Sequence, residues 1–457
     1  LPHHGAILLE FACRYEVAQE IYVLIHYIFS RVRTSIIGLY LPFLVDKLTH
    51  QKIDSNHSLG DLLINYCQKD NKLAFELFWL LKYKCNGLDV AKELAIYQFY
   101  MNKLMESLSP NTVNEIKSSD HFINLLHKIP DRKEHDIYDI KEYFRNINLD
   151  NCTIPFDPTL KIDSIYVPQI KLKQSATHPL WIPLKCYRQK GQCEDVTVLY
   201  KFENIRQDYI ILKAIRLMKH LLATYENIHL EIVDYNVLPL DHESGIIEIV
   251  RSGMTAYEIK ENLKFSILNY IIENNTDQSI DILRKRFVMS CATYCVITYL
   301  FGVGDRHLDN IMITRDGKLF HIDYGFILGT DPKPISQPKI RITKDMVDAL
   351  GGSQSKYFDE FSSLCNNIFQ GLRQHLNLFI VLMSCVCDTE LEYQRVVHLL
   401  TNRFMPGETS KTAIIQLQSE IHRSTQQQNL GVVVSDFFHY HAKEKTLEQV
   451  VTSSQNI

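Results

Sequence analysis

Apolar residues recur at helical spacing through residues 1–128, a stretch rich in leucine and tyrosine and poor in glycine. Leu8 and Leu9 have counterparts in Leu62 and Leu63, each pair inside an apolar helix-like run. Such a weak internal repeat favours stacked helical hairpins, although two amphipathic helices can also resemble each other by chance. We predict an all-α, solenoid-like helical domain over residues 1–128.

The pattern changes further along the chain. Residues 129–160 are charged and carry Asn, Asp and Pro, which is typical of a linker. Short β-branched and aromatic runs fill residues 161–250 around one predicted helix, residues 208–225, whereas residues 251–457 are mostly helical in pattern. We predict an α+β domain with a β-rich N-terminal lobe (161–250) and a helical C-terminal lobe (251–457).

A β-hairpin is predicted inside the second lobe. Two apolar, β-prone runs between Ile311 and Ile322 flank Asp316-Gly317, a strong signal for a two-residue type I′ turn. With that turn, Asn310 and Asp323 become cross-strand partners at the open end of the hairpin. Directly paired residues have Cβ atoms about 4.5–5.5 Å apart.

Polar side chains gather at this open end. The oxygens of Asn310 and Asp323 suit one hard cation, Mg²⁺ or Mn²⁺, held partly by substrate phosphates. Asp305, Arg306 and His307 precede them, so a proton-transfer group would lie beside the metal, as in a kinase. We favour His307 as the base and Asp305 as its orienter, with Asp305 as the alternative base and Arg306 as a structural cation pairing a carboxylate.

The sequence motifs of this region resemble those of a known family. GDRH at 304–307 and HIDYG at 321–325 resemble the phosphatidylinositol 3-kinase superfamily, with Tyr324 where the family usually has Phe. DRHLDN at 305–310 and ILGTDPKP at 327–334 are similar to the class III branch, which makes phosphatidylinositol 3-phosphate on endosomes and autophagic membranes.

The resemblance implies a bilobal, protein-kinase-like catalytic domain that binds ATP. Lys201, at the end of a predicted strand, and Ser175, in the loop SATHP, would contact its phosphates. The connection from Lys201 to RQD at 206–208 is shorter than in the family. The other nucleotide contacts that the resemblance implies are Asp208, Tyr235, Glu248, Val250, Met312 and Ile322.

The segment after the hairpin bears on the lipid substrate. Between residues 326 and 343 the only cations are Lys333, Lys339 and Arg341, against Asp331. A head group with added phosphates would need more positive charge to neutralise it. The segment therefore favours unphosphorylated phosphatidylinositol, with these three cations as its candidate contacts.

Composition and charge restrict the kinds of partner and environment that we expect for this chain. The net charge of −4 gives no general attraction to nucleic acid or an anionic membrane. Eleven cysteines without a CxxC pair indicate reduced, buried thiols. The longest apolar run, residues 376–386, is well below the roughly 20 residues that cross a bilayer. Because the sequence starts with Leu1, we expect a piece of a longer protein; in the resembled family a C2 domain precedes this region.

Residues 432–441 predict a helix with aromatic side chains on one side, followed by Lys443 and Lys445. Such a helix can lie in a membrane interface, and the resembled family ends in one that engages membrane and restrains the idle enzyme. A helix packed on the core is the alternative.

The resemblance thus implies an ATP-dependent lipid kinase acting on the 3-hydroxyl of phosphatidylinositol. A phosphatidylinositol 4-kinase, a related protein Ser/Thr kinase and a pseudokinase scaffold are the alternatives; the last is disfavoured because Lys201, Asn310 and Asp323 are all present. Expected partners are membrane phosphatidylinositol, a protein-kinase-like or scaffold regulatory subunit and further complex subunits, without nucleic acid. The expected location is cytoplasmic, peripheral on endosomal and autophagosomal membranes.

Overall fold

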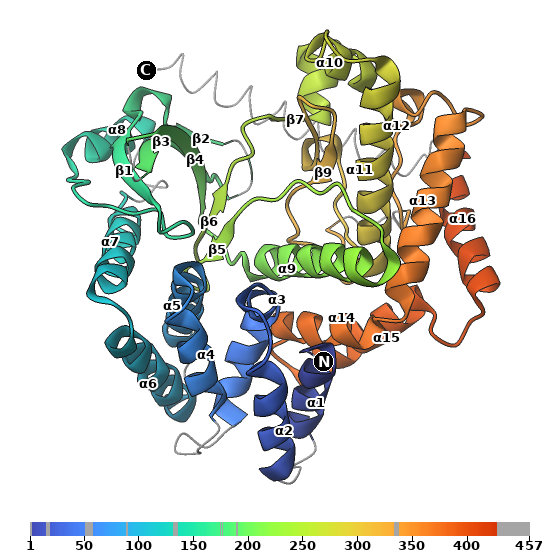
Figure 1. The fold of residues 1–457 in the computed structure, drawn as a ribbon. Coiled ribbons are helices and arrows are strands. Elements are labelled where there is room, and N and C mark those ends of the chain that lie inside the picture. The colour runs from blue at the N-terminus through green and yellow to red at the C-terminus, as the bar shows by residue number, and fades with distance from the viewer. Residues whose placement is uncertain are drawn as a thin grey trace. The chain divides into compact units, whose positions relative to one another are not determined.

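The computed structural model describes residues 2–14, 19–50, 58–87, 90–130, 136–173, 175, 177–188, 191–332 and 338–426. Figure 1 shows its helices and strands. The chain divides into two compact units. The first unit contains Leu1–Lys213, Tyr235–Val250 and Val381–Val386, and the second contains Ala214–Asp234, Arg251–Ile380 and Cys387–Ile457. The helix expected at 432–441 and the side chain of Lys333 lie outside the described residues.

Helices fill the described part of residues 2–126, in keeping with the helical spacing of the sequence. Several begin at a side-chain cap, as where Ser109 accepts the Thr112 N–H ahead of Pro110. Trp79 and Tyr100 are nearly fully buried among these helices. The helices are α1 (Pro2–Arg14), α2 (Gln19–Phe29), α3 (Thr34–Asp46), α4 (Leu59–Cys67), α5 (Asn71–Asn86), α6 (Ala91–Ser107) and α7 (Pro110–Leu126), with a short 3₁₀ turn, Lys47–His50, after α3.

The segment expected as a linker, 129–160, contains a further helix, α8 (Ile137–Asn146). A six-stranded antiparallel sheet follows, in the order β1-β3-β4-β6-β5 with β2 beside β3. Lys201 ends β4 and lies opposite Gly245 of β6. The strands are β1 (Leu160–Ile165), β2 (Lys171–Leu172), β3 (Leu180–Arg188), β4 (Cys193–Lys201), β5 (Val237–Pro239) and β6 (Gly245–Glu248). A β-rich region around one helix, α9 (Arg206–Leu221), is therefore confirmed.

The second unit is mainly helical around a three-stranded antiparallel sheet, β7-β8-β9. Its longest helix, α11, is buried almost continuously from Phe287 to Phe301, and it packs against α13 and α15. The helices are α10 (Ile267–Glu273), α11 (Ile280–Phe301), α12 (Lys344–Ala349), α13 (Lys356–Arg373), α14 (Leu376–Met383), α15 (Glu390–Phe404) and α16 (Ser410–Gln426); the strands are β7 (Gly253–Thr255), β8 (Ile311–Thr314) and β9 (Leu319–His321).

The predicted hairpin is present, but its predicted register was wrong by one residue. Ile311 pairs with His321, and the Ile322 N–H donates to the Asn310 carbonyl at 3.2 Å, so Asn310 lies opposite Ile322 instead of Asp323. The cause is a three-residue turn in which Gly317 is left-handed, with φ of 91°. A type I turn followed by a left-handed glycine adds one residue to the loop that a type I′ turn would have.

Within the part of the chain that the structure describes, no helix combines the length and the apolar character needed to cross a membrane.

Candidate active site

The catalytic loop, which we define as residues 302–310, connects α11 to β8. Gly302 ends α11 in the left-handed conformation, with φ of 55°. The carbonyl of Asp305 is the centre of the loop, because it accepts the His307 N–H at 3.1 Å and Asn310 Nδ2 at 2.9 Å. Both bonds fix the loop by its backbone. Two of the sequence-predicted residues, Asp305 and Asn310, are thus brought into direct contact.

Arg306 ties this loop to the end of β9. Its guanidinium donates to the carbonyls of Gly304 at 2.7 Å and Ile322 at 2.8 Å, and to the carbonyl of Asp323. Arg306 is buried. Bonds to three backbone carbonyls are in keeping with the structural role expected for Arg306.

His307 lies beside Asp305, as its candidate role requires. Its Nε2 is 3.6 Å from Asp305 Oδ2, within ion-pair range but longer than a hydrogen bond. The imidazole is 6% exposed, so its interaction with the carboxylate is screened less than at the surface. An imidazole beside a carboxylate has the groups that the candidate role calls for, a proton acceptor and a neighbouring negative charge.

Asp323 follows β9 in a left-handed conformation, with φ of 61°. A residue in this region breaks the two-residue alternation of a strand, so the register of the hairpin does not by itself set the direction of the Asp323 side chain. The carboxylate is exposed, and its Oδ1 accepts the Gly325 N–H at 3.3 Å. Positive φ at Asp305 and Asp323 costs on the order of 1–3 kcal/mol each, a strain that clusters at functional sites.

The oxygens here fit a divalent cation. The Nδ2 of Asn310 donates to the Asp305 carbonyl, so its amide oxygen is the end left to face a ligand. The Asp323 carboxylate is the other candidate donor, and both are hard oxygens of the type that Mg²⁺ and Mn²⁺ prefer. Among the described residues no group of three or more His, Cys, Asp or Glu is placed to hold a metal. A cation at this pair would therefore depend on phosphate oxygens for further ligands.

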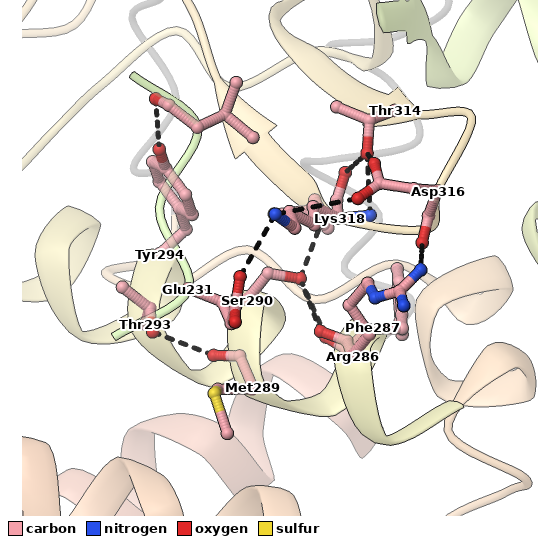
Figure 2. A network of polar contacts seen from close by, with 12 residues as sticks. Glu231, Arg286, Phe287, Met289, Ser290, Thr293, Tyr294, Thr314, Asp316 and Lys318 are labelled. Carbon is pink, nitrogen blue, oxygen red and sulfur yellow. Dashed lines mark hydrogen bonds and ion pairs between the residues drawn. The ribbon is translucent and has the colours of Figure 1, made fainter. Parts of the chain in front are cut away.

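The far end of the hairpin is fixed by ion pairs, as Figure 2 shows. Lys318 Nζ lies 3.1 Å from a Glu231 carboxylate oxygen and 3.6 Å from one of Asp316. Arg286 of α11 donates to the Asp316 carbonyl at 2.6 Å. Thr314 Oγ1 donates to the Asp316 carboxylate at 2.5 Å and accepts the Lys318 N–H at 2.8 Å. These bonds stabilise the three-residue turn.

Ser290 joins the hairpin to α11 (Figure 2). It is fully buried, and its Oγ accepts the Leu319 N–H at 2.9 Å while donating to the Arg286 carbonyl at 3.1 Å. A serine in the mostly buried stretch of α11 was the available signal for this contact, and the sequence-based prediction did not include it.

In the first unit, Lys201 is 7% exposed and its Nζ lies 2.6 Å from Glu203 Oε1. Ser175 lies in an exposed loop, where its N–H donates to the Lys173 carbonyl and its carbonyl accepts the His178 N–H, both at 3.1 Å. His178 is left-handed, with φ of 44°.

Similarity to known proteins can now be set beside this geometry. Residues 195–392 match the family of phosphatidylinositol 3- and 4-kinases. This stretch, which includes the catalytic loop and the hairpin, is similar to a phosphatidylinositol 3- and 4-kinase domain.

Three curated relatives are similar over longer stretches. The phosphatidylinositol 3-kinase pik3 of Schizosaccharomyces pombe is 29% identical over 420 residues, 84% of this chain and 52% of the relative. The phosphatidylinositol 3-kinase VPS34 of Arabidopsis thaliana is 36% identical over 242 residues, 52% of this chain and 29% of the relative. The phosphatidylinositol 3-kinase VPS34 of Candida glabrata is 33% identical over 282 residues, which are 59% of this chain and 31% of the relative. The chain spans about half the length of the first relative and under a third of the other two.

The remaining candidate nucleotide contacts of the kinase domain lie in both units. Asp208 and Tyr235 are buried. The Glu248 N–H donates to the Asn236 carbonyl at 2.8 Å, and its carboxylate accepts Asn236 Nδ2 at 2.6 Å. The N–H and the carboxylate of Glu248 therefore bond within the sheet, and the backbones of Glu248 and Val250 stay the candidate contacts. Met312 and Ile322 are half-buried at the hairpin.

The candidate lipid-contacting cations of the kinase domain differ in their surroundings. Lys339 forms an ion pair with Glu420 at 2.9 Å. Arg341 is 9% exposed. The described part of this segment therefore presents less positive charge than its sequence alone indicates.

Proposed function

We propose that this chain is the catalytic part of a class III phosphatidylinositol 3-kinase, which transfers the γ-phosphoryl group of ATP to the 3-hydroxyl of phosphatidylinositol. The observation that carries the proposal is the buried His307 beside the Asp305 carboxylate, on a loop that also holds Asn310, all within the matched kinase domain. The names of the three relatives, each a phosphatidylinositol 3-kinase, support the choice of lipid and hydroxyl.

In the proposed reaction His307 removes the proton of the inositol hydroxyl, and Asp305 stabilises the imidazolium that forms. Asn310 and Asp323 would hold Mg²⁺ or Mn²⁺, which would neutralise charge on the phosphate oxygens. Lys201 and Ser175 would contact the ATP phosphates. The other proposed nucleotide contacts are Asp208, Tyr235, Glu248, Val250, Met312 and Ile322.

The proposed substrate is phosphatidylinositol without further phosphates on its head group. Few cations stand in the segment, one of which pairs with Glu420 while another, Arg341, is buried. Lys333, Lys339 and Arg341 stay the candidate contacts to the lipid. A head group with additional phosphates would lack partners for its charge.

A lipid assay tests the proposal directly. The chain is incubated with ATP, Mg²⁺ or Mn²⁺, and vesicles of phosphatidylinositol or of its 4,5-bisphosphate, and the deacylated products are separated by position of the phosphate. We expect phosphatidylinositol 3-phosphate as the main product. A 4-phosphate product would identify a phosphatidylinositol 4-kinase, and equal turnover of both lipids would contradict the proposed specificity.

We further propose that the protein acts as a peripheral enzyme on endosomal and autophagosomal membranes, with a protein-kinase-like or scaffold subunit and other complex subunits, and without nucleic acid. The sequence of residues 432–441 would engage the membrane. Deleting residues 436–457 is then expected to lower activity on vesicles severely while ATP hydrolysis without lipid is kept or raised. A parallel loss of both activities with unfolding would instead identify a packed core helix.

A further inference from the structure

Two segments of the second unit run backbone against backbone at the active site. One is the beginning of the catalytic loop, residues 301–305, and the other is residues 326–331, which follow Asp323. Three hydrogen bonds of 2.8–2.9 Å join them: Leu328 N–H to the Phe301 carbonyl, Gly329 N–H to the Gly302 carbonyl, and Gly304 N–H to the Phe326 carbonyl.

Glycine is required for this close approach. A Cβ at Gly304 would lie 2.2 Å from the Thr330 carbonyl oxygen and 3.0 Å from Asp331 Oδ2. Such distances cannot be accommodated without moving the backbone. The carboxylate of Asp331 is therefore held directly against the loop by the packing of two chain segments.

A tight turn delivers Asp331 to this position. Leu328 and Gly329 both have positive φ, 58° and 79°, and the Thr330 N–H donates to the Ile327 carbonyl at 3.2 Å. Two successive residues of positive φ are the signature of a type I′ turn. Thr330 Oγ1 also donates to the Ile327 carbonyl, at 2.7 Å, and fixes the turn from its side chain. A leucine in this conformation is strained, which is common near functional sites.

The bond that the turn delivers goes to the centre of the catalytic loop. Asp331 Oδ2 accepts the Asp305 N–H at 2.9 Å. Asp305 is itself left-handed, with φ of 51°, and its carbonyl is the acceptor for His307 and Asn310. The Asp331 carboxylate therefore fixes the N–H of Asp305. The carbonyl of Asp305 in turn positions His307, the proposed base, and Asn310, the proposed metal ligand.

We propose that Asp331 is a positioning residue of the active site. Its bond to the Asp305 N–H fixes the left-handed backbone there and, through it, the placement of His307 and Asn310. Its effect on rate rests on the proposed phosphoryl transfer, whereas its effect on the loop does not. A displacement of about 1 Å in reacting groups can lower a rate by about 10²-fold, so the loss expected from Asp331→Ala is about tenfold or more in kcat, with the KM for ATP within about twofold.

Four proteins test the proposal: the unmodified chain, Asp331→Ala, Asp331→Asn and the control Asp348→Ala. Asp331→Asn keeps a side-chain oxygen that can accept the Asp305 N–H, and Asp348 is an exposed carboxylate on α12. Hydrogen–deuterium exchange of peptides covering 303–307, read by mass spectrometry, reports the amide without any substrate. We expect exchange about tenfold faster in Asp331→Ala only, and kcat in Asp331→Asn at least half of the unmodified value.

Unchanged exchange in Asp331→Ala would overturn the proposal, as would equal acceleration in Asp331→Ala and Asp331→Asn. If Asp331→Ala does not fold, Asp331→Glu replaces it, because a carboxylate moved by one methylene cannot keep the 2.9 Å bond without shifting the loop. Faster exchange is expected there too, and unchanged exchange would overturn the proposal. An unmodified chain that makes no 3-phosphate would contradict only the proposed function, since the exchange result is read independently.

Discussion

The catalytic loop and the Ser175 loop are both proposed to act on ATP, yet they are built in opposite ways. In the catalytic loop, Arg306 and Asn310 are buried, and their side chains donate hydrogen bonds to backbone carbonyls. In the Ser175 loop, Ser175 and His178 are exposed, and two backbone bonds of 3.1 Å define the turn.

The difference matches the proposed chemistry. A proton transfer needs its groups held within a fraction of an ångström before substrate arrives. A phosphate contact made by backbone amides tolerates adjustment, because several donors can share one anion. We therefore expect substitutions in the catalytic loop to lower kcat strongly, and substitutions in the Ser175 loop to act weakly and through KM.

His307→Gln should have the largest effect. Glutamine keeps a polar side chain of similar size but cannot accept the proton, and general base catalysis contributes about 10²–10⁴-fold. We expect kcat on phosphatidylinositol vesicles to fall by that factor. The control His422→Gln, at an exposed position of α16, should keep normal activity. If Asp305→Asn lowers kcat far more than His307→Gln does, Asp305 is the base.

Asp323→Asn should have the second largest effect. We expect kcat to fall by about 10²-fold or more, because the proposed metal would lose a carboxylate ligand and its charge. The melting temperature should change little, since the carboxylate is exposed. Raising Mg²⁺ or Mn²⁺ should restore part of the activity. Activity close to that of the control Asp348→Asn would show that the metal is held elsewhere.

His321, at the end of β9, makes the stability of the hairpin sensitive to pH. Burial, and then the charge of Arg306, lowers the pKa of this imidazole from 6.5 to about 3. Between these values the unfolded chain binds a proton that the folded chain does not, so stability should fall as the pH is lowered below about 6.5, by up to about 1.4 kcal/mol per pH unit.

His321→Gln should remove this contribution while keeping a polar side chain of similar size. Melting temperatures from pH 7 to pH 4.5 measure it: the curve for the variant should be flatter than that for the unmodified chain. Parallel curves would show that His321 does not titrate between the two states.

Ser175→Ala should have the smallest effect. If backbone amides supply most of the phosphate contact, the KM for ATP should rise about two- to fivefold with kcat nearly unchanged, equivalent to about 1 kcal/mol or less, as for one ordinary hydrogen bond. Ser164→Ala, in β1, is the control. A 10²-fold loss of kcat would place this exposed loop in the same class as the catalytic loop and remove the contrast between them.

The sequence predicted the hairpin because β-prone runs and Asp316-Gly317 are local signals. It could not predict the register, since the same two residues serve a two- or a three-residue turn. Two contacts stabilise the three-residue turn. Thr314, at the end of β8, donates to the Asp316 carboxylate, and Arg286 of α11 donates to the Asp316 carbonyl.

The candidate site shows the same division. Asp305, His307 and Asn310 could be proposed from the sequence because they lie within six residues of one another in a recognisable order. Ser290 and Asp331 were not, although both bond directly to this region. Their roles arise from contacts between segments that only the fold brings together, and Asp331 reads in the sequence as one acid among prolines and a lysine.

The ion pair between Lys201 and Glu203 changes what nucleotide affinity would measure. With its ammonium already 2.6 Å from a carboxylate oxygen, Lys201 would exchange one anion for another when a phosphate arrives. On the proposed role of Lys201, the free energy of binding is then a difference between two ion pairs, the first of which joins a buried lysine to a part-exposed glutamate. Removing Glu203 would raise affinity for the triphosphate and for competing anions alike, so the acidic side chain acts as a built-in competitor that sets how readily the lysine accepts any ligand.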